Sequence, residues 1–313
     1  MKFLFFGTAD FGIPALESLL EAGHSPMAVV TNPPRPAGRG RKLRESPVAT
    51  HCRQNHPNLV VETPNDLRDP SCIERIQRYG ADVFVVVAFS LLPEEIFSIP
   101  PKGTFNIHGS LLPAYRGPAP IHRAIAAGET ETGVTVFRID HGVDTGAILL
   151  QRTEPIFPDD TTPTLYHRLS LLGGEAIVDA FGLLENNEDT YVAQDERRAS
   201  RAPLLRKSEE RIDWSEDARV IERKIRAFIP FPGSATLYNG QKLTLTRAQV
   251  EPGIDGAPGE VVRRTKKELI VACGVDGLKI ERLKPQGRKE MPIDAYLNGS
   301  SLKEGCMLDE AEK

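Results

Sequence analysis

The residues best suited to chemistry lie in one short segment, residues 104–113, which reads TFNIHGSLLP. Asn106 and His108 are two positions apart, so in a strand their side chains project from the same face. An otherwise apolar strand that carries two polar groups on one face must find partners for them. We therefore expect an amide and an imidazole side by side at a strand end. A polar strand end that only hydrogen-bonds a neighbouring loop is the alternative interpretation.

A third polar residue, Asp144, lies in the turn-rich loop 140–146 and could reach His108 from there. Such a set suits acyl transfer to an amine. The imidazole stabilises a developing oxyanion or moves a proton, the carboxylate orients the imidazole, and the amide of Asn106 donates a hydrogen bond. The sequence has no GxSxG nucleophile motif, so we expect direct transfer without a covalent enzyme intermediate. Asp140 and His141 are local rivals for which a loop-shaping or solvated role is the simpler interpretation.

A basic insert occupies residues 32–45 and has no acidic residue before Glu45. Its five cationic residues are Arg35, Arg39, Arg41, Lys42 and Arg44. Three prolines and two glycines predict an extended and mobile loop. Charges this dense repel one another unless a polyanion neutralises them, which favours an arm that contacts phosphates, and arginines can also stack on unpaired bases. A solvated loop is the alternative.

Several functional classes are disfavoured. The turn from Gly7 to Gly12 is GxxxxG without a following Lys-Ser/Thr, and Thr31-Asn32 stands where a ribose-binding acid would be expected, so neither a P-loop nor a dinucleotide site is indicated. The four cysteines are scattered without metal-ligand spacing, so no metal is expected. No apolar run reaches 18 residues and no targeting segment precedes the first strand, which predicts a cytoplasmic protein of bacterial type.

The elements that must position these residues follow from periodicity. At about 150 residues per domain, 313 residues suggest two domains. Short apolar runs alternate with amphipathic stretches, which predicts an α/β fold with a Rossmann-like, mostly parallel sheet and helices on both faces. The loop 140–146 is too short for a helical crossover, so the strands on either side of it should be antiparallel. The expected strands are 3–6, 28–31, 59–62, 82–88, 103–108, 133–138 and 148–152, and the expected helices are 13–22, 48–55, 71–78 and 162–184.

The C-terminal part has a different pattern. We expect a catalytic domain at 1–188, a polar linker at 189–210 and a small β-barrel domain at 211–313. That domain should begin with a helix over 215–228, capped by Ser215 or Asp213. Its five short strands are expected at 235–238, 243–250, 259–264, 268–273 and 277–283. The net charge of the chain is −4, yet Lys and Arg exceed Asp and Glu over 211–290, which hints at an anionic partner for this part.

The segment 106–113, together with Asp144 in its loop, resembles the 10-formyltetrahydrofolate-dependent formyltransferases. The resemblance implies that Asn106, His108 and Asp144 are the catalytic trio and that 10-formyltetrahydrofolate is the co-substrate. It also implies a folate pocket lined by Ser110, Leu111, Leu112, Pro113, Phe89, Ser90, Leu91 and Asp140.

Within that superfamily the chain resembles the methionyl-tRNA formyltransferase family over nearly its whole length. Residues 35–43, 119–121, 131–135, 211–215 and 226–228 carry this resemblance. It implies formyl transfer to methionine on initiator tRNA, a second domain of the oligonucleotide-binding type, a basic loop that reaches the acceptor end, and a monomer without a protein partner. The segment 87–93 is one residue shorter than is usual in the family, and His122 stands where Gln is expected.

Two other functions remain open. A folate-dependent formyltransferase acting on an amino-sugar nucleotide would share the trio and a barrel-like second domain, but it would not need the five cationic residues of the insert. A tRNA-binding protein with an inactive site is the third possibility, and the intact trio argues against it.

Overall fold

The computed structural model describes residues 1–37 and 42–309 of the chain. The chain divides into two compact units, and the division is discontinuous in sequence. Unit 1 contains Met1–Pro120, Glu131–Pro155 and Tyr166–Ala202, and unit 2 contains Ile121–Thr130, Ile156–Leu165 and the chain from Pro203 onward. The domain boundaries at 188 and 210 stay a prediction.

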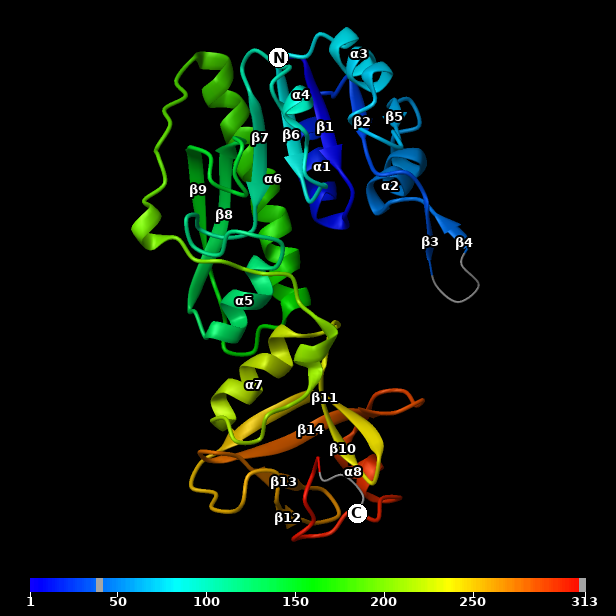
Figure 1. Ribbon diagram of the computed structural model, residues 1–313, viewed down its shortest axis with the longest axis vertical. Helices are drawn as coiled ribbons and strands as arrows, with labels where there is room; N and C mark the ends of the chain where they lie inside the picture. Colours follow the sequence, from blue (N-terminus) through cyan, green and yellow to red (C-terminus); the bar gives the residue numbers. More distant parts are fainter. Residues whose placement is uncertain (38–41, 310–313) are drawn as a thin grey trace. The chain divides into compact units, whose positions relative to one another are not determined.

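Unit 1 is built on a seven-stranded sheet with the order β5-β2-β1-β6-β7-β8-β9 (Figure 1). The strands are β1 (Phe3–Gly7), β2 (Ala28–Val30), β5 (Val61–Glu62), β6 (Val83–Val87), β7 (Thr104–His108), β8 (Glu131–Arg138) and β9 (Ile148–Pro155). The first five strands of this order are parallel, whereas β8 is antiparallel to both β7 and β9. The prediction of a mostly parallel sheet with an antiparallel pair next to the loop 140–146 is therefore confirmed.

Helices cover both faces of this sheet, as the apolar strands predict. On one face, Phe6 packs with Ile76 of α3 (Pro70–Arg78) and Ile96 of α4 (Glu94–Phe97). On the other face, the ring of Phe3 meets Phe181 of α6 (Thr162–Asn186) edge-on, with centroids 5.0 Å apart. The remaining helical segments of this part are η1 (Asp10–Gly12), α1 (Ile13–Glu21), α2 (Pro47–Asn55) and η2 (Glu196–Arg198).

The basic insert differs from the extended loop predicted for it. Strand β3 (Arg35–Ala37) pairs with β4 (Lys42–Arg44) in an antiparallel two-stranded ribbon. Pro36 lacks an N–H, but in a two-stranded ribbon each strand has an unpaired edge, so a proline is tolerated there. The predicted residues Arg39 and Arg41 lie outside the described residues.

Unit 2 is an antiparallel half-barrel, in agreement with the β domain predicted for the C-terminal part. Its sheet has the order β10-β11-β14-β13-β12, with β15 paired to β14. The core includes Trp214, whose indole N–H donates to Thr236 Oγ1 at 3.2 Å. The strands are β10 (Ser234–Tyr238), β11 (Gln241–Glu251), β12 (Val261–Arg264), β13 (Leu269–Ala272), β14 (Gly277–Pro285) and β15 (Met291–Pro292). Its complete helical segments are η3 (Lys207–Glu210), α7 (Ala218–Ala227) and α8 (Ile293–Leu297), and α5 (Pro120–Ala127) also falls almost wholly in this unit.

The predicted start of the helix over 215–228, with Ser215 or Asp213 as its cap, is wrong. The helix begins at Ala218 and is capped by Asp217, whose carboxylate accepts from the backbone N–H of Arg219. Asp213 instead accepts from the backbone N–H and the hydroxyl of Ser215, which forms a separate Asx turn before the helix. Three nearby residues can each act as a cap, and the sequence alone does not separate them.

Across the described ranges, no helix of the protein combines the length and the apolar character that crossing a membrane would require.

Candidate active site at the end of strand β7

His108 closes strand β7, and its imidazole is 6% exposed. Its Nε2 lies 2.9 Å from the carbonyl oxygen of Tyr115, so that nitrogen carries a proton and donates it. Its Nδ1 lies 3.7 Å from Oδ2 of Asp144. Both ring nitrogens thus face oxygen acceptors, an arrangement that accommodates an imidazolium. The structure brings together His108 and Asp144, which are 36 positions apart in sequence.

Asn106 is half-buried and occupies the same strand, opposite Val86 of β6 and Phe137 of β8. The alternation along β7 places its side chain on the face from which His108 projects. The carboxyl end of β7 therefore carries the amide and the imidazole on one face, as expected from the sequence.

Asp144 is held by a network that the sequence analysis did not find. Its backbone has a φ of 56°, and its Oδ2 accepts the backbone N–H of Gly117 at 2.8 Å. The side-chain amide of Gln194 donates to the carbonyl oxygens of Asp144 and Gly146, at 2.9 and 2.8 Å. Arg116 in turn donates to Oε1 of Gln194 at 3.0 and 2.8 Å. The position of the carboxylate beside His108 is thus fixed through backbone and side chain together.

Gly117 is required at its place in this network. Its φ of 122° is a conformation that other residues rarely adopt, and a Cβ there would come within 2.7 Å of the carbonyl oxygen of Ala202. The backbone of Arg116 pairs with the same segment, because the Arg116 N–H donates to Ser200 O and the Ala202 N–H donates to Arg116 O. Residues 194–202, which belong to the predicted linker 189–210, therefore hydrogen-bond to the segment of Arg116 and to the loop of Asp144.

The loop after β7 is rigid because its polar groups are paired. The hydroxyl of buried Ser110 donates to the carbonyl of Ala114 at 2.6 Å, and Thr135 Oγ1 donates to the Ser110 carbonyl at 2.7 Å. The Leu112 N–H donates to Thr135 Oγ1, and the amide of Gln151 donates to the Leu112 carbonyl. Among the folate contacts predicted here, Ser110 and Leu112 are buried, whereas Leu111 and Pro113 are half-buried.

The other predicted folate contacts lie in two separate segments. Phe89 packs edge-on against Phe6, with ring centroids 5.6 Å apart, and Leu91 is 80% exposed. Ser90 is exposed, and its hydroxyl lies 3.5 Å from Asn32 Oδ1. Asp140 accepts from the Gly142 N–H and from the Thr145 hydroxyl, so the structure gives this carboxylate a loop-shaping position.

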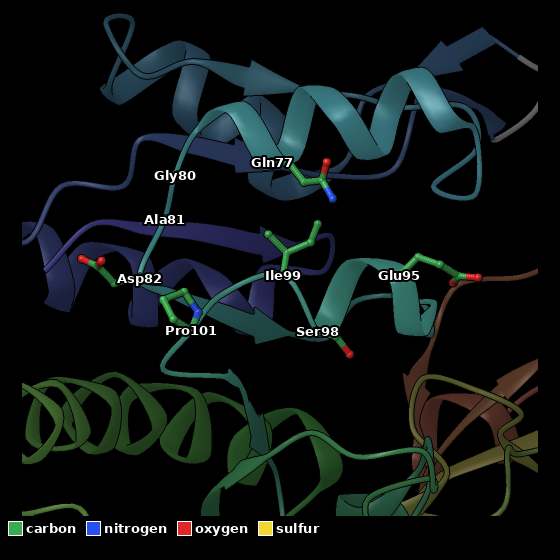
Figure 2. Close-up of a pocket in the computed structure, with 8 residues that line it drawn as sticks. All are labelled: Gln77, Gly80, Ala81, Asp82, Glu95, Ser98, Ile99 and Pro101. Atoms are coloured by element: carbon green, nitrogen blue, oxygen red, sulfur yellow. The ribbon is translucent and has the colours of Figure 1, made fainter.

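Two hollows lie at opposite edges of the sheet. One, of about 600 Å³, is lined by residues around Asp82 and Pro101, which precede β6 and β7 (Figure 2). The other, of about 560 Å³, includes Thr8, Asn32, Arg35 and further residues that follow β1 and β2. Ligands of open α/β sheets bind outside the carboxyl ends of the strands, where His108 also lies. The second hollow therefore lies at the edge where a ligand is expected, whereas the hollow of Figure 2 lies where strands β6 and β7 begin.

The exposed basic side chains of the ribbon border this second hollow. Arg35 and Arg44 line it, together with the N-cap residue of α2, Ser46. Arg35, Lys42 and Arg44 are exposed. The part of the ribbon that the structure describes thus presents three exposed cations, two of which, Arg35 and Arg44, line a cavity at the carboxyl edge of the sheet.

His122, the predicted departure from the usual Gln, lies in α5. Burial, assisted by the charge of Arg123, lowers the pKa of His122, so the imidazole is neutral at pH 7.

The sequence and the fold were compared with those of known proteins, and both match formyltransferases. Residues 1–181 match the formyl transferase family model and residues 204–301 match that of the formyl transferase C-terminal domain. The chain therefore belongs to the formyl transferase family. The fold also matches that of the N-formyltransferase from Helicobacter canadensis, whose structure contains folinic acid and dTDP-3-aminofucose. The TM-score is 0.68 at 18% identity, over 93% of this chain and 100% of that one.

The full-length relatives identify the branch of the family. The chain is 39% identical to the methionyl-tRNA formyltransferase of Geobacter sulfurreducens, over 99% of this chain and 98% of that protein. It is 42% identical to the methionyl-tRNA formyltransferase of Jannaschia sp., over 99% and 100%. Within the family, this chain thus groups with the methionyl-tRNA formyltransferases.

Proposed function

We propose that this protein transfers the formyl group of 10-formyltetrahydrofolate to the α-amino group of methionine on initiator methionyl-tRNA. The observation that carries the proposal is the pairing of His108 with Asp144 on the face that also carries Asn106, in a chain about 40% identical over its whole length to methionyl-tRNA formyltransferases. All four cysteines are free, which suits the reducing cytoplasm where we place the reaction.

In the proposed mechanism, the amine attacks the formyl carbon directly. A carbon–nitrogen bond forms, and the electron pair of the formyl C=O bond moves onto oxygen. Collapse of the tetrahedral intermediate then breaks the bond from carbon to N10 of the folate, the new ammonium loses a proton, and N10 gains one. The product is the formylated amine and tetrahydrofolate.

Asn106 and His108 are the groups proposed to stabilise the oxyanion. The contact of His108 Nε2 with the Tyr115 carbonyl is a hydrogen bond of ordinary length, whereas the 3.7 Å between Nδ1 and Asp144 exceeds that length. Because Nε2 is already engaged with the Tyr115 carbonyl, we assign Nδ1–H as the group that donates to the formyl oxygen. Asp144 orients the imidazole without accepting a full hydrogen bond from it. Donors placed for the transition state raise kcat more than they strengthen substrate binding.

The tRNA is proposed to bind through cations. Arg35, Lys42 and Arg44 of the ribbon are exposed, and Arg35 and Arg44 line the cavity at the carboxyl edge of the sheet. They are suited to phosphate contacts, and the same role is proposed for Arg39 and Arg41, which lie outside the described residues.

A single assay tests the proposal. The purified protein is supplied with 10-formyltetrahydrofolate and either methionyl-tRNA or an amino-sugar nucleotide, and formyl transfer to each is measured. We expect turnover with methionyl-tRNA and none with the sugar. Transfer to the sugar nucleotide alone would overturn the assignment of the acceptor, and absence of transfer to both would overturn the assignment of the reaction.

A further inference from the structure

Three potential metal ligands converge between helices α1 and α2, away from the catalytic trio. Oε1 of Glu17 lies 2.5 Å from Nε2 of His51 and 2.6 Å from Nε2 of His56. The three ligand atoms lie within 4.8 Å of one another, and within residues 1–37 and 42–309 this is the one such group of three or more His, Cys, Asp or Glu residues. All three side chains are between 23% and 31% exposed, so an ion from solvent can reach them.

The helices bring these residues together for a local reason. His51 lies inside α2, and His56 is its C-terminal cap residue, with φ and ψ of −132° and 63°. The chain leaves the helix at that residue, and the imidazole of His56 lies beside that of His51, with ring centroids 5.8 Å apart. Glu17 approaches both from α1.

We propose that Glu17, His51 and His56 bind a divalent transition-metal ion, preferably Zn²⁺. Two imidazoles and one carboxylate are a known zinc ligand set, in which water takes the fourth position. The ion would join α1 to α2 beside the cavity that Arg35 and Arg44 line, because His51 lines that cavity too.

Ion binding requires a small adjustment. With bonds of about 2.0–2.1 Å in a tetrahedron, ligand atoms are separated by about 3.3 Å, so the two nitrogens must each move away from Oε1 by roughly 0.7 Å. Rotation of the Glu17 side chain, whose carboxylate is accessible from solvent, provides this. The hydrogen-bonded cluster is thus the metal-free arrangement of the site.

Asn55 gives the proposal a distinctive consequence. Its amide nitrogen lies 3.2 Å from Nδ1 of His51, a contact in which Nδ1 accepts and Nε2 carries the proton. When Nε2 binds a metal, the proton moves to Nδ1, which then needs an acceptor. A carboxylate at position 55 would supply that acceptor directly, whereas the amide of Asn55 must turn over to present its oxygen and so give up the hydrogen bond that its nitrogen donates to the His51 carbonyl at 3.1 Å.

The test is a titration of the full-length protein with Zn²⁺ in competition with a chromophoric chelator. We expect one Zn²⁺ per chain for the wild type, and at least tenfold weaker binding for Glu17→Gln, which preserves the shape of the side chain, and for His56→Ala. His167→Ala and Cys306→Ser are matched controls that remove an exposed histidine and the most accessible cysteine, and both should bind Zn²⁺ as the wild type does.

Zn²⁺ binding by the variant Asn55→Asp distinguishes a metal site from a cluster that is only hydrogen-bonded. The substitution should tighten Zn²⁺ binding by about tenfold, in the range found when an outer partner of a ligand is changed. Zn²⁺ should also raise the unfolding temperature of the wild type and not that of Glu17→Gln, a measurement made on folded protein only. A wild type that does not compete with the chelator at micromolar Zn²⁺, or a Glu17→Gln variant that binds as tightly as the wild type, would overturn the proposal.

Discussion

Gln194→Ala should slow formyl transfer although Gln194 is not one of the proposed catalytic residues. The substitution removes the two hydrogen bonds that its amide donates to the carbonyls of Asp144 and Gly146, and it also leaves Arg116 without an acceptor for two N–H groups. Asp144 keeps its contact with the Gly117 N–H, so the loop loosens without being released.

The magnitude follows from the bonds that are lost. Each neutral hydrogen bond contributes about 1 kcal/mol, so roughly 2 kcal/mol of loop stabilisation disappears. If about half to all of that energy held the carboxylate in place at the transition state, kcat falls by about 5- to 30-fold, since 1.36 kcal/mol is a factor of ten. The KM for folate should change by less than about twofold, because positioning of Asp144 acts on the reaction step.

The assay is steady-state formylation of methionyl-tRNA, with thermal unfolding of each variant measured in parallel. Glu196→Gln is the matched control, because Glu196 also pairs with Arg116 but its side chain is 71% exposed and does not contact the Asp144 loop. Glu196→Gln leaves in place the hydrogen bonds from Gln194 to the Asp144 loop, so kcat should change by less than about twofold. If both variants lower kcat equally, or if Gln194→Ala raises KM at unchanged kcat, Gln194 does not act by positioning Asp144.

Three further predictions concern the trio, the ribbon and unit 2. His108→Ala should lower kcat by about 100-fold or more while folate binding, measured by fluorescence titration, is retained; near-normal kcat would contradict the role of His108. The double substitution Arg35→Ala and Arg44→Ala should weaken tRNA binding and reduce the slope of log affinity against log salt by about two, and an unchanged slope would show that neither arginine contacts phosphate. The hydrogen bond to Arg123 is the main cause that lowers the pKa of Glu209, so this pair stabilises the protein above the usual pKa of Glu, and the stabilisation is lost as pH falls through the lowered pKa. Glu209→Gln should therefore lower the unfolding temperature at pH 7 and have a much smaller effect near pH 3. Equal effects at the two pH values would refute the pairing.

The sheet, and the placement of Asn106, His108 and Asp144 at one edge of it, could be predicted from the sequence because their signals are local. Apolar runs of four to seven residues identify strands that are covered on both faces, and period-two spacing puts Asn106 and His108 on one side of β7. The shortness of loop 140–146 was enough to predict the antiparallel pairing of β8 with β9, and that pairing places Asp144 at the same edge of the sheet. Each of these inferences needed only a few neighbouring residues.

The residues that hold Asp144 in place and the residues of the Glu17 cluster could not be found in this way, because the members of each set are distant in sequence. Arg116 and Gln194 are 78 positions apart. Glu17 is 34 positions from His51, and neither residue belongs to a ligand-spacing motif. Hydrophobic periodicity reports which side of an element is buried, but it carries no information about which polar side chains from two elements will meet.

The segment 189–202 is an example of a positioning element that local sequence patterns do not reveal. Its polar and aperiodic sequence is typical of a linker, and local rules assign it no structure. The segment is held in place by another part of the same chain, because the backbone of Arg116 exchanges hydrogen bonds with Ser200 and Ala202. These bonds bring Gln194 to the loop of Asp144. The carboxylate of Asp144, which lies 3.7 Å from Nδ1 of His108, is therefore supported from outside its own loop, and the proposed role of Asp144 in orienting His108 would depend on that support. Aperiodic polar stretches next to a predicted active site are therefore places to look for positioning residues.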